Sequence, residues 1–312
     1  MFARSLLRQH ARAGAAMLSL PVVAGLAAGR CDDRVYVSGE ALGRGVRLEY
    51  WKAKHENVVV LDLESELIQL GMTRIRDREN GGARFVHDAN SVLRATLDLA
   101  LTELPNDEEA VVTTPRGHKV EGVVFEDDVK VCGITVSSIA DVEANLLQVL
   151  KNTLPFDSQL GNVIIQESDK GDARIVKASL PDDLDGCEVL LLVPEFNSLE
   201  KLNKLILLLR QEGVEESKIS IVTLVTCPEA ADKFCQTFGD AKLITASFDA
   251  ARDRNGHIIP GVGDFEARYL GSNDDSSDAE TTSSSSEDES PADLDSEPAK
   301  KSWWPSFLGG SK

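Results

Sequence analysis

The sequence has few residues of the types that carry metal or nucleophile chemistry. Its five cysteines and five histidines are scattered along 312 residues, and none has the paired spacing of a zinc site. Most of the cysteines lie in or beside apolar runs, which favours buried, reduced thiols. No nucleophile motif can be built from these residues either. We therefore expect no metal site and no resident cofactor.

Long apolar runs are also missing. The run from Ala15 to Gly29 has about 15 residues, whereas a helix needs about 20 to cross a membrane. We therefore expect no membrane-spanning segment.

Acidic residues are absent from the amino terminus. Arginines recur at positions 4, 8 and 12, and no acidic residue precedes Asp32. An arginine-rich, acid-free segment predicts a mitochondrial presequence over residues 1–31, followed by an extension over 32–57. A secretory signal is the alternative, because the apolar run ends in small residues. We expect the protein in the mitochondrial matrix or on the matrix face of the inner membrane.

Basic residues are absent from Asn273 to Ala299. This stretch holds ten acidic residues, which supply more than half of the net charge of −19. Such a composition predicts a disordered, serine-rich acidic linker over residues 272–299, and it argues against direct nucleic-acid binding. The linker either serves solubility or is phosphorylated in its serine run, Ser283 to Ser286.

Aromatic residues are scarce but gather at the carboxyl terminus. Trp303, Trp304 and Phe307 lie within residues 300–312, and the chain has only three tryptophans. Exposed aromatics are typical of binding hot spots, so we interpret this segment as a docking peptide for a protein partner. Packing of the segment on its own domain is the alternative.

Between these ends, the sequence predicts one α/β domain. Residues 187–192 form an apolar run typical of a buried parallel strand. Apolar residues at helical spacing follow from Leu199 to Glu212 and stop at Gly213, and a second apolar run covers 219–225. This strand, helix, strand unit predicts a parallel sheet, with ligands at the carboxyl ends of its strands.

A β-hairpin is predicted nearer the amino terminus of the domain. Residues 113–118 contain turn-forming types and lie between two β-prone runs.

The segment from Asn255 to Asp264, Asn-Gly-His-Ile-Ile-Pro-Gly-Val-Gly-Asp, resembles the uracil-binding tail of the uracil phosphoribosyltransferases. Weaker similarities lie in the family's order at Arg268 to Gly271, Leu224 to Glu229 and Val58 to Asp62. The resemblance covers residues 58–271. It implies a single parallel-sheet, Rossmann-like phosphoribosyltransferase domain that makes UMP from uracil and phosphoribosyl pyrophosphate.

The resemblance fails in the loop that would hold the phosphoribosyl donor. The family uses Asp-Pro-Met-Leu-Ala-Thr-Gly-Gly-Ser there, with the Asp on the ribose and the Thr and Gly amides on the 5′-phosphate. In this chain Val193 stands at the Asp, Pro194 is kept, Ser198 replaces the Thr, and Leu199 and Glu200 replace the two glycines. We expect Leu199 to block the backbone from a phosphate and Glu200 to repel it. We also expect Asn197 and Glu200 to cap the following helix.

Two arginines that the resemblance assigns to phosphate binding are missing as well. Their positions hold Val136, in the segment Gly133 to Ser138, and Gln166 on a gapless alignment. Without these clamps little remains to orient a donor that carries several negative charges.

The tail loop is the part of the family's site that is kept. By correspondence, residual uracil binding would use Ile258, Gly263 and Asp264. The alternative is that the glycines and proline of this loop serve only a tight turn. Phe265 replaces the family's usual Ala and is expected to fill part of the pocket.

Together these features predict a catalytically inactive, uracil phosphoribosyltransferase-like protein. We expect it to be a structural or assembly component of a mitochondrial complex, such as a ribosome or a respiratory assembly. One alternative is an active uracil phosphoribosyltransferase, which would require magnesium; another is a protein that binds uracil or a uridine nucleotide without turnover. A homodimer is compatible with each interpretation.

Overall fold

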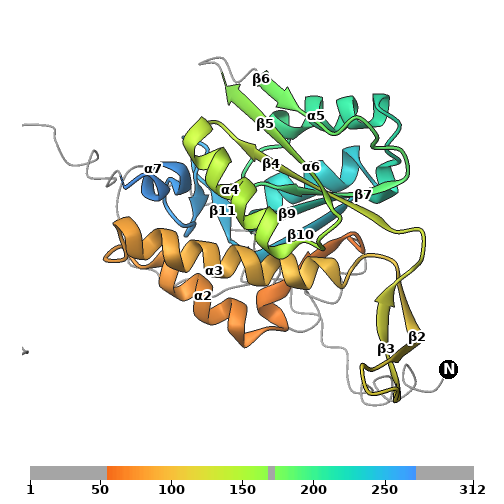
Figure 1. The fold of residues 1–312 in the computed structure, drawn as a ribbon. Helices are drawn as coiled ribbons and strands as arrows, with labels where there is room; N and C mark the ends of the chain where they lie inside the picture. The colour runs from red at the N-terminus through yellow and green to blue at the C-terminus, as the bar shows by residue number, and fades with distance from the viewer. Residues whose placement is uncertain (1–54, 168–172, 272–312) are drawn as a thin grey trace, which may run out of the picture.

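The computed structural model describes residues 55–167 and 173–271. The predicted presequence, the acidic linker and the docking segment with Trp303, Trp304 and Phe307 lie outside these residues. The described residues form one main sheet with helices on both faces and a separate hairpin (Figure 1). The predicted α/β architecture is thus confirmed. No helix among the described residues is long and apolar enough to cross a membrane.

The main sheet has the order β1-β10-β9-β7-β4-β5-β6, with the short β8 paired to β9. All pairs are parallel except that of β6 with β5. The strands are β1 (Val58–Val60), β4 (Lys130–Ser137), β5 (Gln159–Glu167), β6 (Ala173–Ser179), β7 (Cys187–Leu192), β8 (Glu195–Phe196), β9 (Ile219–Thr226) and β10 (Lys242–Phe248). Every residue of β7 and β9 is buried, as the continuous apolar runs predict for strands covered on both faces.

The direction of each connection between parallel strands determines which face of the sheet its helix covers. The connection from β4 to β5 runs one way along the sheet, whereas those from β7 to β9 and from β9 to β10 run the other way. Right-handed crossovers therefore place α4 (Ala140–Thr153) on one face and both α5 (Glu200–Gln211) and α6 (Pro228–Thr237) on the opposite face. Two helices from the amino-terminal part, α2 (Glu66–Arg76) and α3 (Gly82–Leu101), pack against one another, and α3 also packs against α4.

Short elements complete the domain. The predicted hairpin is confirmed: β2 (Asn106–Thr113) pairs with β3 (Lys119–Phe125) and projects away from the sheet (Figure 1). The tail loop holds the small ladder of β11 (Ala251–Arg252) and β12 (Ile258–Ile259), followed by α7 (Phe265–Tyr269). Two 3-10 turns, η1 (Leu61–Leu63) and η2 (Glu216–Lys218), precede α2 and β9.

Candidate active site

The sheet has one switch point, between β4 and β7, where consecutive connections leave in opposite directions. In open parallel sheets such a point forms a crevice at the carboxyl ends of the strands. A cavity of about 300 Å³ lies there. Its walls come from the end of β4, the loop after β7, the start of α5 and the tail loop. The structure therefore places the candidate site where the strand pattern predicts it.

The donor-loop positions divide between this cavity and another surface. Val193 and Pro194 line the cavity. Leu199 and Glu200 instead border a shallow depression between α5 and α6, with Lys233 on its far side. Ser198 lines neither surface and contacts the carboxylate of Glu200.

The expected role of Glu200 as a charge facing the cavity is therefore wrong. Its carboxylate forms an ion pair with the Lys233 ammonium at 3.2 Å. The contact with the Ser198 hydroxyl, then the hydrogen bond from the backbone amide of Glu200 itself, and then the contact with Lys233 hold the pKa of Glu200 well below its usual range. Its position in the first turn of α5 still suits the helix dipole.

The expected cap of α5 by Asn197 is also wrong. The cap residue is Leu199, whose side chain makes no capping hydrogen bond, while the Ser198 hydroxyl accepts from the Glu200 amide at 3.3 Å. The Asn197 amide nitrogen instead donates to the Gly256 carbonyl oxygen in the tail loop, at 3.1 Å. This contact joins segments 59 residues apart, so local spacing carries no signal for it.

The first residues of the donor loop pair with β9. The Val193 amide donates to the Val222 carbonyl at 2.9 Å, and the Leu224 amide donates to the Pro194 carbonyl at 3.1 Å. Directly after Pro194, β8 pairs with the end of β9. Residues 193–196 therefore run along β9, and they precede the positions that form the phosphate cradle in the family.

A carboxylate occupies the loop that follows β4. Glu266 Oε1 accepts hydrogen bonds from the Ser138 amide at 2.8 Å and from the Ser137 hydroxyl at 2.5 Å. Its other oxygen contacts the Ser138 hydroxyl. These donors immediately precede α4, whose amino terminus favours negative charge. Glu266 thus places a carboxylate of the chain itself among these donors.

A second acidic side chain, Glu195, lies in the cavity wall. Burial raises the pKa of Glu195 to about 7, although its hydrogen bond from the Phe265 amide, at 3.2 Å, acts in the opposite direction. Asp264 raises this pKa further, and Lys201 lowers it. Within residues 55–167 and 173–271, the cavity wall therefore has three carboxyl groups, those of Glu195, Asp264 and Glu266, and one lysine.

The two positions at which the family has phosphate-binding arginines do not lie in the same site. Val136 lies at the end of β4 and lines the cavity. Gln166 is exposed on β5, opposite Arg174 of β6, and does not line it. Among the residues that the structure describes, Lys201 at the start of α5 is the only lysine or arginine in the wall of this cavity.

Of the expected uracil-binding positions, Gly263 and Asp264 line the cavity and Ile258 does not. Ile258 is buried in the β11–β12 ladder, opposite Arg252. Phe265 lines the cavity, yet its ring is fully buried and stacks on Tyr269 at a centroid distance of 5.3 Å. Its ring thus belongs mainly to the core.

The tail loop is held by contacts within the protein. Gly261 has a φ of +64°, and a Cβ there would lie 2.3 Å from the Ile258 carbonyl oxygen. Its amide donates to Asp249, which also pairs with the Arg76 guanidinium at 2.6 Å. Arg268 donates to the backbone carbonyls of four residues, Ile75, Asp77, Asn80 and Val262. Gly261 and Arg268 therefore have structural roles in this loop.

Of the three acidic side chains in the cavity wall, Asp264 was among the sequence-based site predictions, whereas Glu195 and Glu266 were not. In the donor loop, Glu195 follows Val193 and Pro194, which line the cavity, and precedes Ser198, Leu199 and Glu200, which do not. For Glu266 a signal existed, because the family has Gly where this chain has an acidic residue. No group of three or more His, Cys, Asp or Glu in the described ranges could hold a metal ion.

Comparison with known proteins agrees with the resemblance read from the tail motif. Residues 62–272 match the family model described as uracil phosphoribosyltransferase. The uracil phosphoribosyltransferase of Dictyostelium discoideum is 31% identical over 221 residues, which are 70% of this chain and 98% of that protein. Uracil phosphoribosyltransferase 2 of Schizosaccharomyces pombe is 30% identical over 218 residues, 69% of this chain and 96% of that protein.

Among solved structures, the AQ2163 protein of Aquifex aeolicus superposes with a TM-score of 0.57. The match covers 69% of this chain and 98% of that one, at 17% identity, and shows a shared fold.

Proposed function

The chain belongs to the uracil phosphoribosyltransferase family, and from this premise we propose that it has lost phosphoribosyl transfer and serves as a component of a mitochondrial protein assembly. Membership settles the fold as that of a phosphoribosyltransferase. The loss of activity is our inference, and the observation that carries it is the Glu266 carboxylate in the loop after β4.

The charge of the cavity supports this proposal. Phosphoribosyl pyrophosphate carries several negative charges, and the wall that would receive it has the carboxyl groups of Glu195, Asp264 and Glu266. Two like charges about 4 Å apart, at an effective dielectric constant near 20, repel by roughly 4 kcal/mol, about a thousandfold in affinity. Lys201 alone offsets only part of such repulsion.

The backbone supports it independently. An amide nest for the 5′-phosphate needs glycines at its centre, so that the chain can approach the anion. Leu199 and Glu200 stand at those positions and border a different surface, beside Lys233. The pyrophosphate positions Val136 and Gln166 carry no positive charge.

A non-catalytic uracil-binding protein is the second candidate. Gly263 and Asp264, which correspond to base-binding positions of the family, still line the cavity, and this favours retention of a small neutral ligand. An active enzyme that makes UMP is the third candidate, and its support is the family membership itself.

Two assays separate the three candidates. Purified full-length protein is incubated with uracil, phosphoribosyl pyrophosphate and magnesium, beside the Dictyostelium discoideum relative as a positive control. We expect no UMP above background. Turnover of the order of 1 to 1000 per second would overturn the proposal. Calorimetric titration with uracil alone then tests the second candidate.

The cellular part of the proposal comes from the two termini. Residues 1–31 would direct the protein to the mitochondrial matrix or to the matrix face of the inner membrane. Residues 300–312 would dock it on a protein partner, and the acidic stretch 272–299 would act as a spacer. The net charge of −19 argues against nucleic acid as the direct partner.

A further inference from the structure

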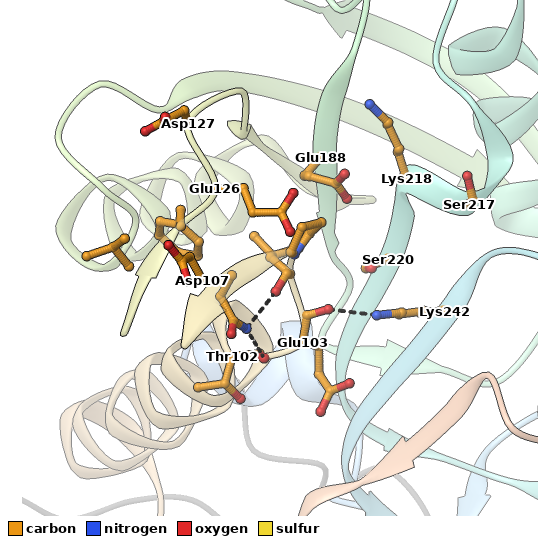
Figure 2. A pocket seen from close by; sticks show the side chains of 15 residues that line it. Thr102, Glu103, Asp107, Glu126, Asp127, Glu188, Ser217, Lys218, Ser220 and Lys242 are labelled. Carbon is orange, nitrogen blue, oxygen red and sulfur yellow. Dashed lines mark hydrogen bonds between the residues drawn. The ribbon is translucent and has the colours of Figure 1, made fainter. Parts of the chain in front are cut away.

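A second cavity lies at the amino-terminal edge of the sheet, away from the candidate active site. Its volume is about 1160 Å³, and it opens where the β2–β3 hairpin leaves the domain (Figure 2). The first residues of β7, β9 and β10 form its floor, and the segments at both ends of the hairpin form its walls. Because these are the starts of the strands, no residue of this cavity belongs to the crevice after β4 and β7.

The wall of this cavity is strongly acidic. Of the side chains that the structure describes, five acidic ones and two lysines line it. Both lysine ammonium groups are already engaged by backbone carbonyls: Lys242 donates to Glu103 at 2.7 Å and Lys218 to Gly186 at 3.1 Å. The acidic residues are Glu103, Asp107, Glu126, Asp127 and Glu188, and Figure 2 shows them arranged around the cavity.

One of these acidic residues is largely buried, and its carboxylate faces the cavity without a direct partner. Glu188, the second residue of β7, is only 8% exposed, and among the described residues it forms no hydrogen bond and no ion pair within 4 Å. Burial raises its pKa, and Lys218 and Lys242 offset this effect only from a distance. Carboxylates are rarely this buried unless they are paired. Ser220 on the neighbouring strand β9 is 2% exposed and lies in the same wall.

We propose that this cavity binds the lysine or arginine side chains of a basic segment of a protein partner. Charge complementarity selects the ligand class, because an ammonium or guanidinium group would give Glu188 the partner that it lacks. The cavity is larger than the roughly 300–1,000 Å³ of ordinary small-molecule pockets and suits several side chains at once. Val124 of the hairpin, 41% exposed, offers apolar surface for the aliphatic stems. The inference rests on the proposed role as a component of an assembly and names the chemistry of the partner.

The test uses the full-length protein and a fluorescein-labelled hexalysine peptide, followed by fluorescence anisotropy. We expect Glu188→Gln and Glu126→Gln each to weaken binding by about tenfold, since each removes one carboxylate from the cavity. The matched control is Glu121→Gln, which removes the same charge from β3 outside the cavity and should change affinity less than about twofold. Thermal melts check that each variant is folded, and Glu126, being exposed, reports even if Glu188→Gln unfolds.

Three outcomes would overturn the inference. Equal affinities for all variants would mean that the peptide binds elsewhere, for instance to the ten acidic residues of 273–299. Spermine that competes as well as unlabelled hexalysine would assign the cavity to small polyamines. Hydrogen exchange that is unchanged by the peptide over residues 102–107 and 217–220 would also contradict it. None of these outcomes concerns UMP synthesis, so failure here and failure of the proposed function are separate results.

Discussion

Glu266→Ala is the substitution that tests most directly how the loop after β4 is held. The change removes one carboxylate that accepts hydrogen bonds from the Ser138 amide at 2.8 Å and from the Ser137 hydroxyl at 2.5 Å, and that contacts the Ser138 hydroxyl. Hydrogen bonds to charged groups contribute about 1.5–3 kcal/mol each, and they are not additive when they share one acceptor group.

The expected loss follows from these contacts. The cavity is open to water, which can replace part of what the serines lose, so we expect the free energy of unfolding to fall by about 2–4 kcal/mol. For a domain of this size the melting temperature then falls by about 4–16 °C. Differential scanning calorimetry measures it, with Glu79→Ala, an exposed carboxylate on the loop after α2, as the control expected to stay within about 0.5 kcal/mol.

The same variant should also acquire an anion site. With Glu266 gone, the Ser138 amide and the amino terminus of α4 are free to receive a phosphate group. Pyrophosphate at about ten times its Kd would then stabilise Glu266→Ala by about 1.4 kcal/mol and leave the wild type unchanged. Equal melting temperatures for variant and wild type, or equal stabilisation of both by pyrophosphate, would refute the reasoning.

Three further predictions concern other parts of the chain. Because the pKa of Glu195 is raised to about 7, the folded state keeps the proton of this carboxyl group between roughly pH 4.5 and 7, whereas the unfolded chain releases it. The free energy of unfolding therefore falls as pH rises through this window. Chemical denaturation should show Glu195→Gln to be more stable than the wild type by about 1–3 kcal/mol at pH 8 and no more stable at pH 4. Residues 1–35 fused to a fluorescent reporter should send it to mitochondria, and a secreted or cytosolic reporter would reject the presequence. Changing Trp303, Trp304 and Phe307 to Ala should release the protein from its native assembly, as gel filtration would show, without altering its melting temperature. If the variant still elutes with the assembly, or if its melting temperature falls, the docking hypothesis is wrong.

The central fold was predictable because its signals are local. The apolar run of β7 and the helical spacing of α5 are both present as expected, and the helix ends next to Gly213, which has a φ of +95°. The start of α5 was not predictable in the same way. Asn197 has the spacing of a cap, but its side chain bonds the Gly256 carbonyl, and only the folded chain brings that acceptor near.

The location of the site in the fold was predictable from the sequence, whereas the charge of the cavity wall was not. Val136, Val193, Pro194, Gly263 and Asp264 all reach the cavity, since ends of parallel strands meet at one edge of the sheet. The direction in which each carboxylate points depends on packing. Glu266 contacts Ser138 across 128 residues of sequence, whereas Glu200 bonds to a lysine on the next helix.

The contrast between the two loops bears on why one family motif is present and another is missing. The tail loop has structural duties: Gly261 cannot accept a Cβ, its amide holds Asp249, and Arg268 ties the following helix to the loop after α2. A protein that no longer bound uracil would still need these residues to fold. In the donor loop, Val193 and Pro194 contact β9 through backbone groups that any strand-forming residue supplies, so these contacts do not require the family's Asp-Pro sequence. Loss of selection for phosphoribosyl transfer would therefore leave the tail motif and release the donor loop, and this is the pattern that the sequence carries.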